Sequence, residues 1–312
     1  MTQTLAFVFP GQGSQAVGML AELAADHPQI GDTFAEAAEA LGYDLWQLCQ
    51  NGPEAELNRT DRTQPAILAA SVALWRVWEA NSAARPAFVA GHSLGEYSAL
   101  VVAGVIGLAD ALRLVERRGQ LMQQAVPAGE GAMAAILGLT DEQIIDLCAQ
   151  AAEGEVVSAV NFNAPGQVVV AGQKAAVQRA IEACKAAGAK RAIELPVSVP
   201  SHCALMRPAA EQLAKDFEQL NWQEPAITLV QNVSARPAPD MTTLRAQLVE
   251  QLYSPVRWVE SVEYIAAQGV TDLIECGPGK VLSGLNKRCA KGVATHNLDS
   301  AAGLAAALAQ FA

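Results

Sequence analysis

A serine at a sharp chain reversal is the first residue of this sequence that could do chemistry. Residues 87–96 read AFVAGHSLGE, an apolar strand that runs through the pattern G-x-S-x-G into a helix. In that pattern the serine stands on a strained turn with its hydroxyl clear of the sheet. Ser93 is therefore a candidate nucleophile, and the backbone N–H of Leu94 is a candidate donor to an oxyanion. The pattern is short enough to arise by chance, so an ordinary glycine-rich turn is the alternative.

A histidine far along the chain is the best candidate for a base that would activate this serine. The sequence has four histidines, and His202, in the run Pro200-Ser201-His202, stands on a loop between a predicted strand and a predicted helix. His92 is next to Ser93 in the chain, but on a tight turn its side chain points elsewhere. A serine and a histidine of this kind can act together in covalent catalysis. The alternative is a loop histidine whose hydrogen bonds are satisfied by its surroundings.

An arginine on the apolar side of a helix is the third candidate. Residues 108–124 predict a helix in which Ala111, Val115 and Met122 form one apolar stripe, and Arg118 falls on the same stripe. An unpaired buried charge is costly, so this arginine needs an anionic partner. A planar guanidinium can bind a carboxylate through two parallel hydrogen bonds, so the partner of Arg118 could be a carboxylate of the substrate. A structural salt bridge or a side chain that reaches back to water is the alternative.

A glycine-rich loop follows the first predicted strand. Residues 10–16 read PGQGSQA after the apolar strand Leu5–Phe9, which matches the loose dinucleotide fingerprint G-x-G-x-x-A. A nucleotide fold would need a second strand ending in an acid about 20 residues later, but residues 33–41 have helical spacing. We therefore expect the loop to serve the Ser93 site, with Gln12 as the second oxyanion donor. A nucleotide loop and a plain turn are the alternatives.

The elements after residue 130 indicate part of the fold that must position these candidates. The predicted order is β-α-β-β-α-β, with strands at 132–137, 156–161, 167–171 and 190–195 and helices at 141–152 and 174–187. This is the order of a ferredoxin-like unit. We expect an α/β protein with a ferredoxin-like subdomain at 128–197, inserted into a catalytic core at 1–127 and 198–312. Asn161 and Asn163 are interpreted as turn residues, with a polar contribution to a cleft as the alternative.

Composition excludes several classes of protein. The chain has 312 residues, of which 51% are hydrophobic and 17% charged, enough for a large core of about two domains. The net charge of −11 argues against non-specific binding to nucleic acid. The N-terminus lacks the features of a signal peptide, and no apolar run approaches the ~20 residues of a membrane span. The six cysteines lack a C-x-x-C pair, so we expect free thiols, no metal site and a cytoplasmic location.

The acid of a complete catalytic triad is missing from the expected place. The aspartates between Ser93 and His202 are interpreted as helix caps or surface residues: Asp110, Asp141 and Asp146. A serine esterase or thioesterase shares G-x-S-x-G but does not need Arg118, and it is the first rival hypothesis. A non-catalytic dinucleotide-binding module built on residues 11–16 is the second.

Five motifs stand in the order of one known family. They are GQGSQ at 11–15, GHSLGE at 91–96, ERRG at 116–119 around Arg118, PSH at 200–202, and Gln251 before LYSP at 252–255. With these motifs the chain resembles the malonyl-CoA:acyl carrier protein transacylases of bacterial fatty-acid synthesis, from about residue 4 to 299. The resemblance implies an α/β-hydrolase-like core with an inserted ferredoxin-like subdomain.

The resemblance also implies roles for single residues. Ser93 would be the nucleophile and His202 its base, with a backbone carbonyl near Gln251 orienting the imidazole in place of an aspartate. The backbone N–H groups of Gln12 and Leu94 would form the oxyanion hole, and Arg118 would bind the malonyl carboxylate.

The implied reaction is a ping-pong transfer without a cofactor, in which malonyl-CoA acylates the serine and the phosphopantetheine thiol of acyl carrier protein takes the malonyl group. We expect a monomer that docks the carrier protein on a local basic patch. The candidates for that patch are Lys190, Arg191, Lys287, Arg288 and Lys291. Malonyl-selective relatives often carry phenylalanine before the histidine, where this chain has Ser201, so the chain's discrimination against an α-methyl group stays open.

Overall fold

A computed structural model describes residues 4–197 and 199–311, and its main body is built on a parallel sheet. The strand order is β7-β2-β1-β8-β9, and each neighbouring pair is parallel. The strands are β1 Leu5–Phe9, β2 Phe88–Gly91, β7 Thr228–Val230, β8 Asp272–Glu275 and β9 Ala294–Asn297. The predicted α/β class is confirmed. The carboxyl ends of parallel strands meet at one edge, which is where such sheets hold their sites.

Helices cover both faces of this sheet, because β1 is apolar on both sides. Phe7 packs edge-on against Trp75 and Trp78 of α5 Thr60–Asn81, whereas Val8 belongs to the cluster of Trp258 on the opposite face. The remaining helices are α1 Ala21–Asp26, α2 Pro28–Leu41, α3 Leu45–Asn51, α4 Glu54–Leu57, α6 Gly95–Val102, α7 Leu108–Ala125, η1 Ala204–Met206, α10 Arg207–Phe217, α11 Met241–Glu250, α12 Trp258–Ala267, α13 Val281–Cys289 and α14 Ala301–Gln310.

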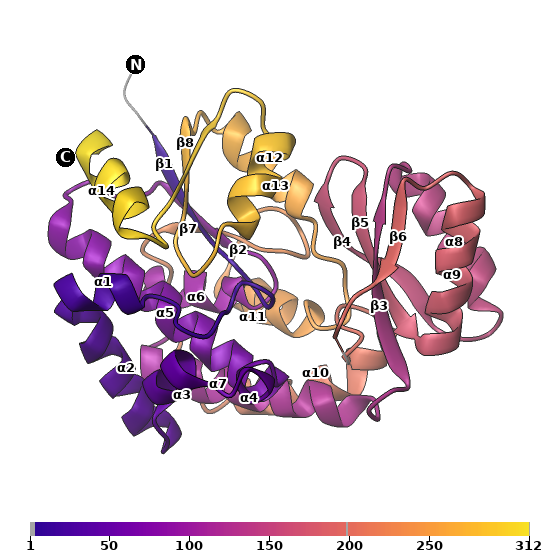
Figure 1. Cartoon of the computed structure of the whole chain (residues 1–312), viewed down its shortest axis with the longest axis horizontal. Coiled ribbons are helices and arrows are strands. Elements are labelled where there is room, and N and C mark those ends of the chain that lie inside the picture. Colours follow the sequence, from indigo (N-terminus) through magenta and orange to yellow (C-terminus); the bar gives the residue numbers. More distant parts are fainter. Residues whose placement is uncertain (1–3, 198, 312) are drawn as a thin grey trace.

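A second, antiparallel sheet stands beside the main body (Figure 1). Its strand order is β4-β5-β3-β6, and helices α8 Asp141–Ala152 and α9 Lys174–Ala186 share a buried apolar cluster with one face. The strands are β3 Gly131–Leu137, β4 Val157–Ala164, β5 Gln167–Gln173 and β6 Arg191–Glu194. These elements follow one another in the predicted order β-α-β-β-α-β.

Strand β4 is longer than predicted, and its edge joins the second sheet to the main body. It continues through Asn163 to Ala164, so the interpretation of Asn161 and Asn163 as turn residues is wrong. The backbone N–H of Phe162 donates to the carbonyl oxygen of Val256 at 3.0 Å, and the N–H of Val256 donates to Val160 at 2.8 Å. The loop before α12 therefore holds this strand edge against the main body.

No helix among residues 4–197 and 199–311 is long and apolar enough to cross a membrane. The same ranges contain no group of three or more His, Cys, Asp or Glu side chains placed to hold a metal ion. All six cysteines are buried free thiols, as predicted.

Candidate active site

Ser93 stands on a strained turn between β2 and α6. Its φ of 54° lies in the left-handed region, which a serine adopts at a cost of about 1–3 kcal/mol. The glycines on either side permit the turn. A Cβ on Gly91 would lie 1.8 Å from the carbonyl carbon of Gly95, and one on Gly95 would lie 2.0 Å from the carbonyl oxygen of Phe9. Only glycine fits at these two positions, which is the physical content of G-x-S-x-G.

An asparagine that the sequence analysis missed fixes this turn. The Oδ1 of Asn232 accepts a hydrogen bond from the N–H of Ser93 at 2.7 Å, and its Nδ2 donates to the carbonyl oxygen of Gly91 at 2.6 Å. Asn232 is buried and follows β7, the neighbour of β2 in the sheet. The signal available in the sequence was its place just after a predicted strand, where site residues of parallel sheets gather.

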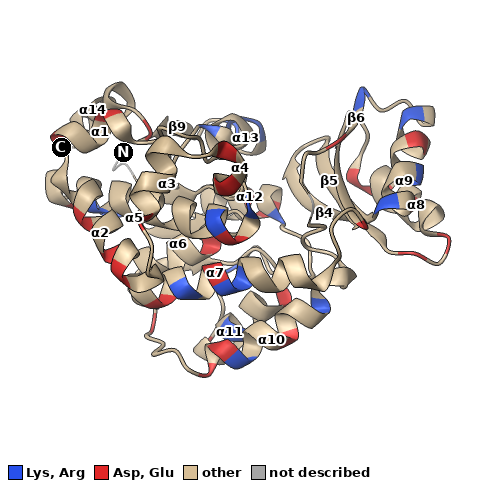
Figure 2. Ribbon diagram, turned by 60° about the horizontal axis from the view of Figure 1, so that its bottom comes forward, with Lys and Arg blue, Asp and Glu red and all other residues tan. Residues whose placement is uncertain are grey.

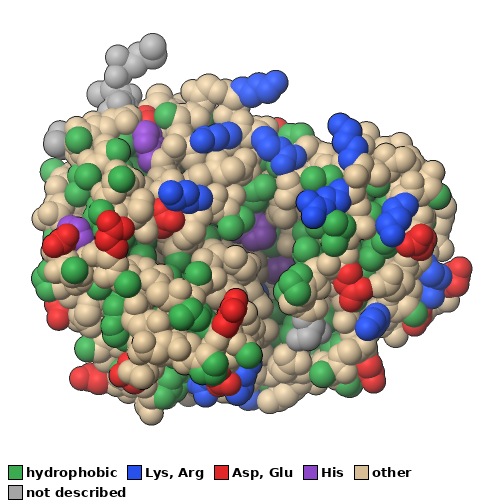
Figure 3. Space-filling view, viewed as in Figure 1, with side chains coloured by type: hydrophobic (Ala, Val, Ile, Leu, Met, Phe, Trp, Pro, Cys, Tyr) green, Lys and Arg blue, Asp and Glu red, His purple; other side chains and the backbone are tan. Residues whose placement is uncertain are grey.

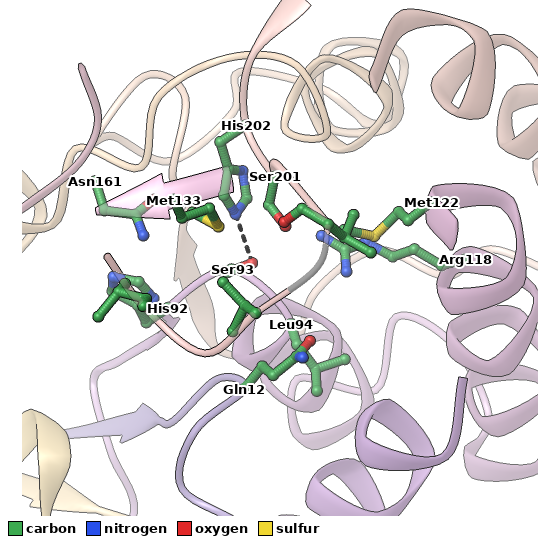
Figure 4. A pocket seen from close by; sticks show the side chains of 13 residues that line it. Gln12, His92, Ser93, Leu94, Arg118, Met122, Met133, Asn161, Ser201 and His202 are labelled. Carbon is green, nitrogen blue, oxygen red and sulfur yellow. Dashed lines mark hydrogen bonds between the residues drawn. The ribbon is translucent and has the colours of Figure 1, made fainter. Parts of the chain in front are cut away.

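His202 lies against Ser93, 109 positions away in the chain. Its Nε2 is 2.7 Å from Oγ of Ser93 (Figure 4), and its Nδ1 is 2.7 Å from the carbonyl oxygen of Gln251. A carbonyl oxygen can only accept, so Nδ1 carries the proton and Nε2 is free to accept from the serine hydroxyl. Burial and the charge of Arg118 lower the pKa of His202 to about 3. The imidazole is therefore neutral, as a general base must be.

Arg118 is buried beside this pair without an anionic partner. Its side chain is 1% exposed, and no carboxylate among the described residues lies within ion-pair distance. Its Nη1 donates to Oε1 of Gln64 at 2.9 Å and its Nη2 to Oε1 of Gln251 at 3.0 Å, while its Nε has no acceptor in the described part of the chain. Burial lowers the pKa of Arg118. The structural salt bridge considered for Arg118 is absent from the described residues, and both amide partners are neutral.

These side chains meet around one small cavity of about 120 Å³. In the space-filling view a hollow lies between the two parts of the molecule, with histidine side chains at its base (Figure 3). Figure 4 shows Ser93, His202 and Arg118 around this space, with Leu94 and Gln12 below the serine. The lining residues are Gln12, His92, Ser93, Leu94, Arg118, Met122, Met133, Asn161, Leu195, Val197, Val199, Ser201 and His202. The sequence candidates for nucleophile, base, oxyanion donors and carboxylate ligand are thus brought together.

The loop after β1 contributes Gln12 to this cavity. In the described part of the chain no acceptor pairs with the backbone N–H of either Gln12 or Leu94. After this loop the chain enters α1 and α2, and the next strand is β2 at Phe88–Gly91. The second strand that a dinucleotide fold requires at this point is absent from the described ranges, so the nucleotide-loop alternative is wrong.

His92 lines the same cavity but pairs with strand β4, whereas the serine hydroxyl pairs with His202. It is half-buried, and its Nε2 is 2.7 Å from Oδ1 of Asn163 on β4. Asn161, two residues earlier on the same strand, lines the cavity with a buried Oδ1 that has no partner among the described residues. Asn161 therefore faces the cavity, Asn163 pairs with His92, which also lines it, and strand β4 supplies one of its walls.

Two more buried polar side chains were missed by the sequence analysis. Gln64, near the start of α5, holds Arg118 as described above. Glu96, in the first turn of α6, accepts from Nε2 of Gln251 at 2.8 Å and from the N–H of Asn232 at 3.2 Å. The signals for Glu96 were its place at the end of the motif GHSLGE and an acid inside the largely apolar helix GEYSALVV.

Comparisons with known proteins agree over nearly the whole chain. The acyl transferase domain family matches residues 6–303. The malonyl CoA-acyl carrier protein transacylase of Salmonella typhimurium is 61% identical over 310 residues, which cover 99% of this chain and 100% of that protein.

Two solved structures are similar at the level of the fold. The acyl carrier protein S-malonyltransferase of Vibrio cholerae has 61% identity and a TM-score of 0.96, over 98% of this chain and 100% of that one. A malonyl-transacylase solved in complex with its type II PKS acyl-carrier protein has 56% identity and a TM-score of 0.97, over 99% of this chain and 100% of that one. The chain therefore belongs to the malonyl CoA-acyl carrier protein transacylases, within the acyl transferase domain family.

Proposed function

We propose that this chain transfers a malonyl group from malonyl-CoA to the phosphopantetheine thiol of acyl carrier protein, through a malonyl ester on Ser93, and so supplies fatty-acid synthesis. One observation carries the proposal. The Ser93–His202 pair opens into a cavity that also holds Arg118, a buried cation with no anionic partner among the described residues. A substrate that combines a reactive carbonyl with a carboxylate fits that combination.

In the first half-reaction, Oγ of Ser93 attacks the thioester carbonyl carbon while Nε2 of His202 takes the hydroxyl proton. The negative charge that develops on the carbonyl oxygen is stabilised by the backbone N–H groups of Gln12 and Leu94. The C–S bond then breaks. The CoA sulfur leaves with the proton from His202, and a malonyl ester remains on Ser93.

In the second half-reaction the carrier protein's thiol occupies the place of CoA. His202 takes the thiol proton, the sulfur attacks the ester carbonyl, and Oγ of Ser93 leaves with the proton. The carbonyl oxygen of Gln251 keeps Nδ1 of His202 protonated throughout and partly compensates the imidazolium charge, so no aspartate is required.

Arg118 gives the site its preference for malonyl. Arg118 lines a cavity of about 120 Å³, its Nε–H has no acceptor among the described residues, and the substrate carboxylate supplies the missing anion. Holding that carboxylate also fixes the ester in one geometry, which favours attack by the positioned thiol over attack by water. An esterase that hydrolyses uncharged acyl groups does not require a buried cation beside its nucleophile.

The two sheets support a division of the chain into units. We assign an α/β-hydrolase-like catalytic core to 1–127 and 198–312, because its parallel sheet carries the serine turn between β2 and α6. We assign a ferredoxin-like subdomain to 128–197, because its strand and helix order and its antiparallel sheet have that form. We expect the enzyme to work as a monomer in the cytoplasm and to need no cofactor.

A groove between the two parts, with basic side chains along its rim, is the proposed docking surface for acyl carrier protein. Lys190 and Arg288 line this open groove next to the turn after β3, together with Asp141 and Glu142, and Arg288 donates to the carbonyl oxygen of Pro165 at 3.0 Å. Lys287 lies in the same last turn of α13 as Arg288. Basic side chains gather along this rim of the hollow (Figure 3), and Figure 2 places them on α13 and near β6. A local basic patch lets a protein of net charge −11 bind an acidic partner.

The test is a transfer assay with malonyl-CoA and holo acyl carrier protein. We expect malonyl carrier protein to form, with free malonate as a minor product, and apo carrier protein, which lacks the thiol, to give no transfer. Release of malonate with no carrier product would instead identify a thioesterase.

A further inference from the structure

The described mechanism leaves one buried carboxylate beneath the serine turn without a role. Glu96 is 1% exposed, and its Oε2 accepts from Nε2 of Gln251 at 2.8 Å and from the N–H of Asn232 at 3.2 Å. Its Oε1 is buried with no hydrogen-bond partner among the described residues. A carboxylate is expensive to bury, and replacement by an apolar side chain would remove that cost. Its place therefore calls for an explanation beyond packing.

Both partners of Glu96 contact the reacting pair. Gln251 donates from Nε2 to the carbonyl oxygen of Ser93 at 2.9 Å, and its own carbonyl oxygen accepts from Nδ1 of His202. Asn232 accepts from the N–H of Ser93 at 2.7 Å. One carboxylate thus anchors the two residues that hold the strained serine and that orient the histidine.

The side chain of Gln251 also connects Glu96 to the substrate-binding cation. The Oε1 of Gln251 accepts from Nη2 of Arg118 at 3.0 Å, while Nε2 of the same amide donates to Oε2 of Glu96. The amide is oriented with its oxygen toward the cation and its nitrogen toward the anion. Glu96 is therefore placed to compensate Arg118 electrostatically across one amide group.

We propose that Glu96 is a positioning residue of the acyl-transfer site and the counter-charge of Arg118 until substrate binds. It acts through Gln251 and Asn232, and it does not touch the substrate. The proposal rests on the proposed function, because the carboxylate that takes its place at Arg118 is that of the malonyl group.

This arrangement couples malonyl binding to a proton. When the substrate carboxylate reaches Arg118, two anions would share one cation in a buried space, which favours the protonated form of Glu96. Burial already raises the pKa of Glu96 to about 7, with Arg118 acting in the opposite direction. Binding above pH 7 therefore requires the uptake of a proton, and the KM for malonyl-CoA should rise with pH.

The other titratable groups around Glu96 and Arg118 do not change charge in that range. Burial raises the pKa of Tyr97 to about 12, and burial with the charge of Arg118 lowers that of His202 to about 3. Burial also lowers the pKa values of Arg118 and His92; the guanidinium stays charged and the imidazole stays neutral. A change in the KM for malonyl-CoA between pH 7 and pH 9 therefore reports the titration of Glu96.

Three variants distinguish the effect of the charge of Glu96 from the effect of its hydrogen bonds to Gln251 and Asn232. Glu96→Gln keeps an oxygen that accepts from both N–H groups but removes the charge, and Glu96→Ala removes both. Glu275→Gln is the matched control, because Glu275 is also a buried carboxylate but accepts from the N–H groups of Leu282 and Ser283 at the start of α13. Acylation by malonyl-CoA and by acetyl-CoA is measured from pH 6 to pH 9, together with thermal unfolding.

We expect the wild-type KM for malonyl-CoA to rise at least about fivefold from pH 7 to pH 9, and the KM for acetyl-CoA, which brings no carboxylate, to stay level. In Glu96→Gln the malonyl-CoA profile becomes flat while kcat stays within about threefold of wild type. Glu96→Ala lowers kcat about 10- to 100-fold, because two hydrogen bonds to the anchoring residues are lost. Glu275→Gln keeps the wild-type KM profiles and kcat, although it unfolds at a lower temperature because its amide nitrogen cannot accept one of the two backbone N–H bonds.

Two results would overturn the proposal. One is a KM for malonyl-CoA that rises equally with pH in the wild type and in Glu96→Gln; that result would show that Glu96 is not the counter-charge of Arg118. The other is a wild-type kcat in Glu96→Ala, which removes the positioning role; if that variant does not fold, the Glu96→Gln profile decides. A wild-type protein that forms no malonyl adduct at all would contradict the proposed function itself, and this outcome is distinct from both.

Discussion

At the scale of single residues, the environment of His202 sets the pH range of the reaction. Burial and the nearby charge of Arg118 both disfavour the imidazolium and lower the pKa of His202 to about 3. A base with a lowered pKa stays unprotonated to lower pH, so activity is retained as the pH falls. We expect kcat/KM for malonyl-CoA to stay level from pH 7 to pH 5, without a fall centred near 6.5. In Arg118→Ala the fall of kcat/KM at acid pH should begin at a higher pH than in the wild type. A wild-type kcat/KM that falls with a midpoint near pH 6.5 would contradict this account.

The second prediction at this scale concerns selectivity. No carboxylate among the described residues lies within ion-pair distance of the buried guanidinium of Arg118, so a malonyl carboxylate would pair with it directly and an acetyl group would not. Charge-assisted hydrogen bonds contribute about 1.5–3 kcal/mol, which corresponds to a preference in kcat/KM of roughly 10- to 150-fold for malonyl-CoA over acetyl-CoA. Arg118→Ala should lower kcat/KM for malonyl-CoA by at least that factor and spare or raise that for acetyl-CoA. The ratio of the two values is the measurement, and an unchanged ratio would make Arg118 structural.

The residues that we propose to carry the chemistry could be found in the sequence more readily than the residues that hold them in place. Ser93 and Arg118 were predictable because a local pattern, the serine turn or the apolar stripe, fixes their surroundings. Asn232 and Glu96 were not predictable, because their hydrogen bonds join positions more than 130 apart in the chain. The bond between these two residues, for example, spans 136 positions. No local periodicity encodes such a contact.

At the scale of elements, the close approach of β1, β2 and α6 decides whether the serine turn forms. A Cβ on Gly95 would lie 2.0 Å from the carbonyl oxygen of Phe9, which is backbone and cannot move aside alone. We expect Gly95→Ala to lower the free energy of unfolding by at least about 3 kcal/mol and to abolish acylation. Gly31→Ala, on an open face of α2, should instead stabilise by about 0.5–1 kcal/mol. Denaturant unfolding tests both, and a fully stable Gly95→Ala would contradict this packing argument.

Strand β4 shows what limits prediction at this scale. The alternating and turn signals of residues 131–195 were enough to place four strands and two helices in order. The extension of β4 to Ala164 was not predictable, because Phe162 and Val160 pair with Val256 from a distant part of the chain. Both expected turn residues are instead strand residues, of which Asn161 lines the cavity and Asn163 pairs with His92.

At the scale of the whole molecule, charge is distributed unevenly for a protein with a net charge of −11. The proposed docking groove includes Lys190 and borders Lys287, so reversal of either charge should raise the KM for carrier protein at least about fivefold and reduce its salt dependence. Acylation by malonyl-CoA should be unaffected. Lys215→Glu on α10, outside the groove, is the control. Equal KM values for all variants would place docking elsewhere.

The central claim is that Ser93 carries the malonyl group between two thiols. Intact-mass measurement after mixing the protein with malonyl-CoA tests it most directly. The account predicts one added malonyl group on the wild-type protein, its loss when holo acyl carrier protein is added, and no adduct on Ser93→Ala. An adduct of the same mass and yield on Ser93→Ala would contradict the assignment of the nucleophile and the mechanism built on it.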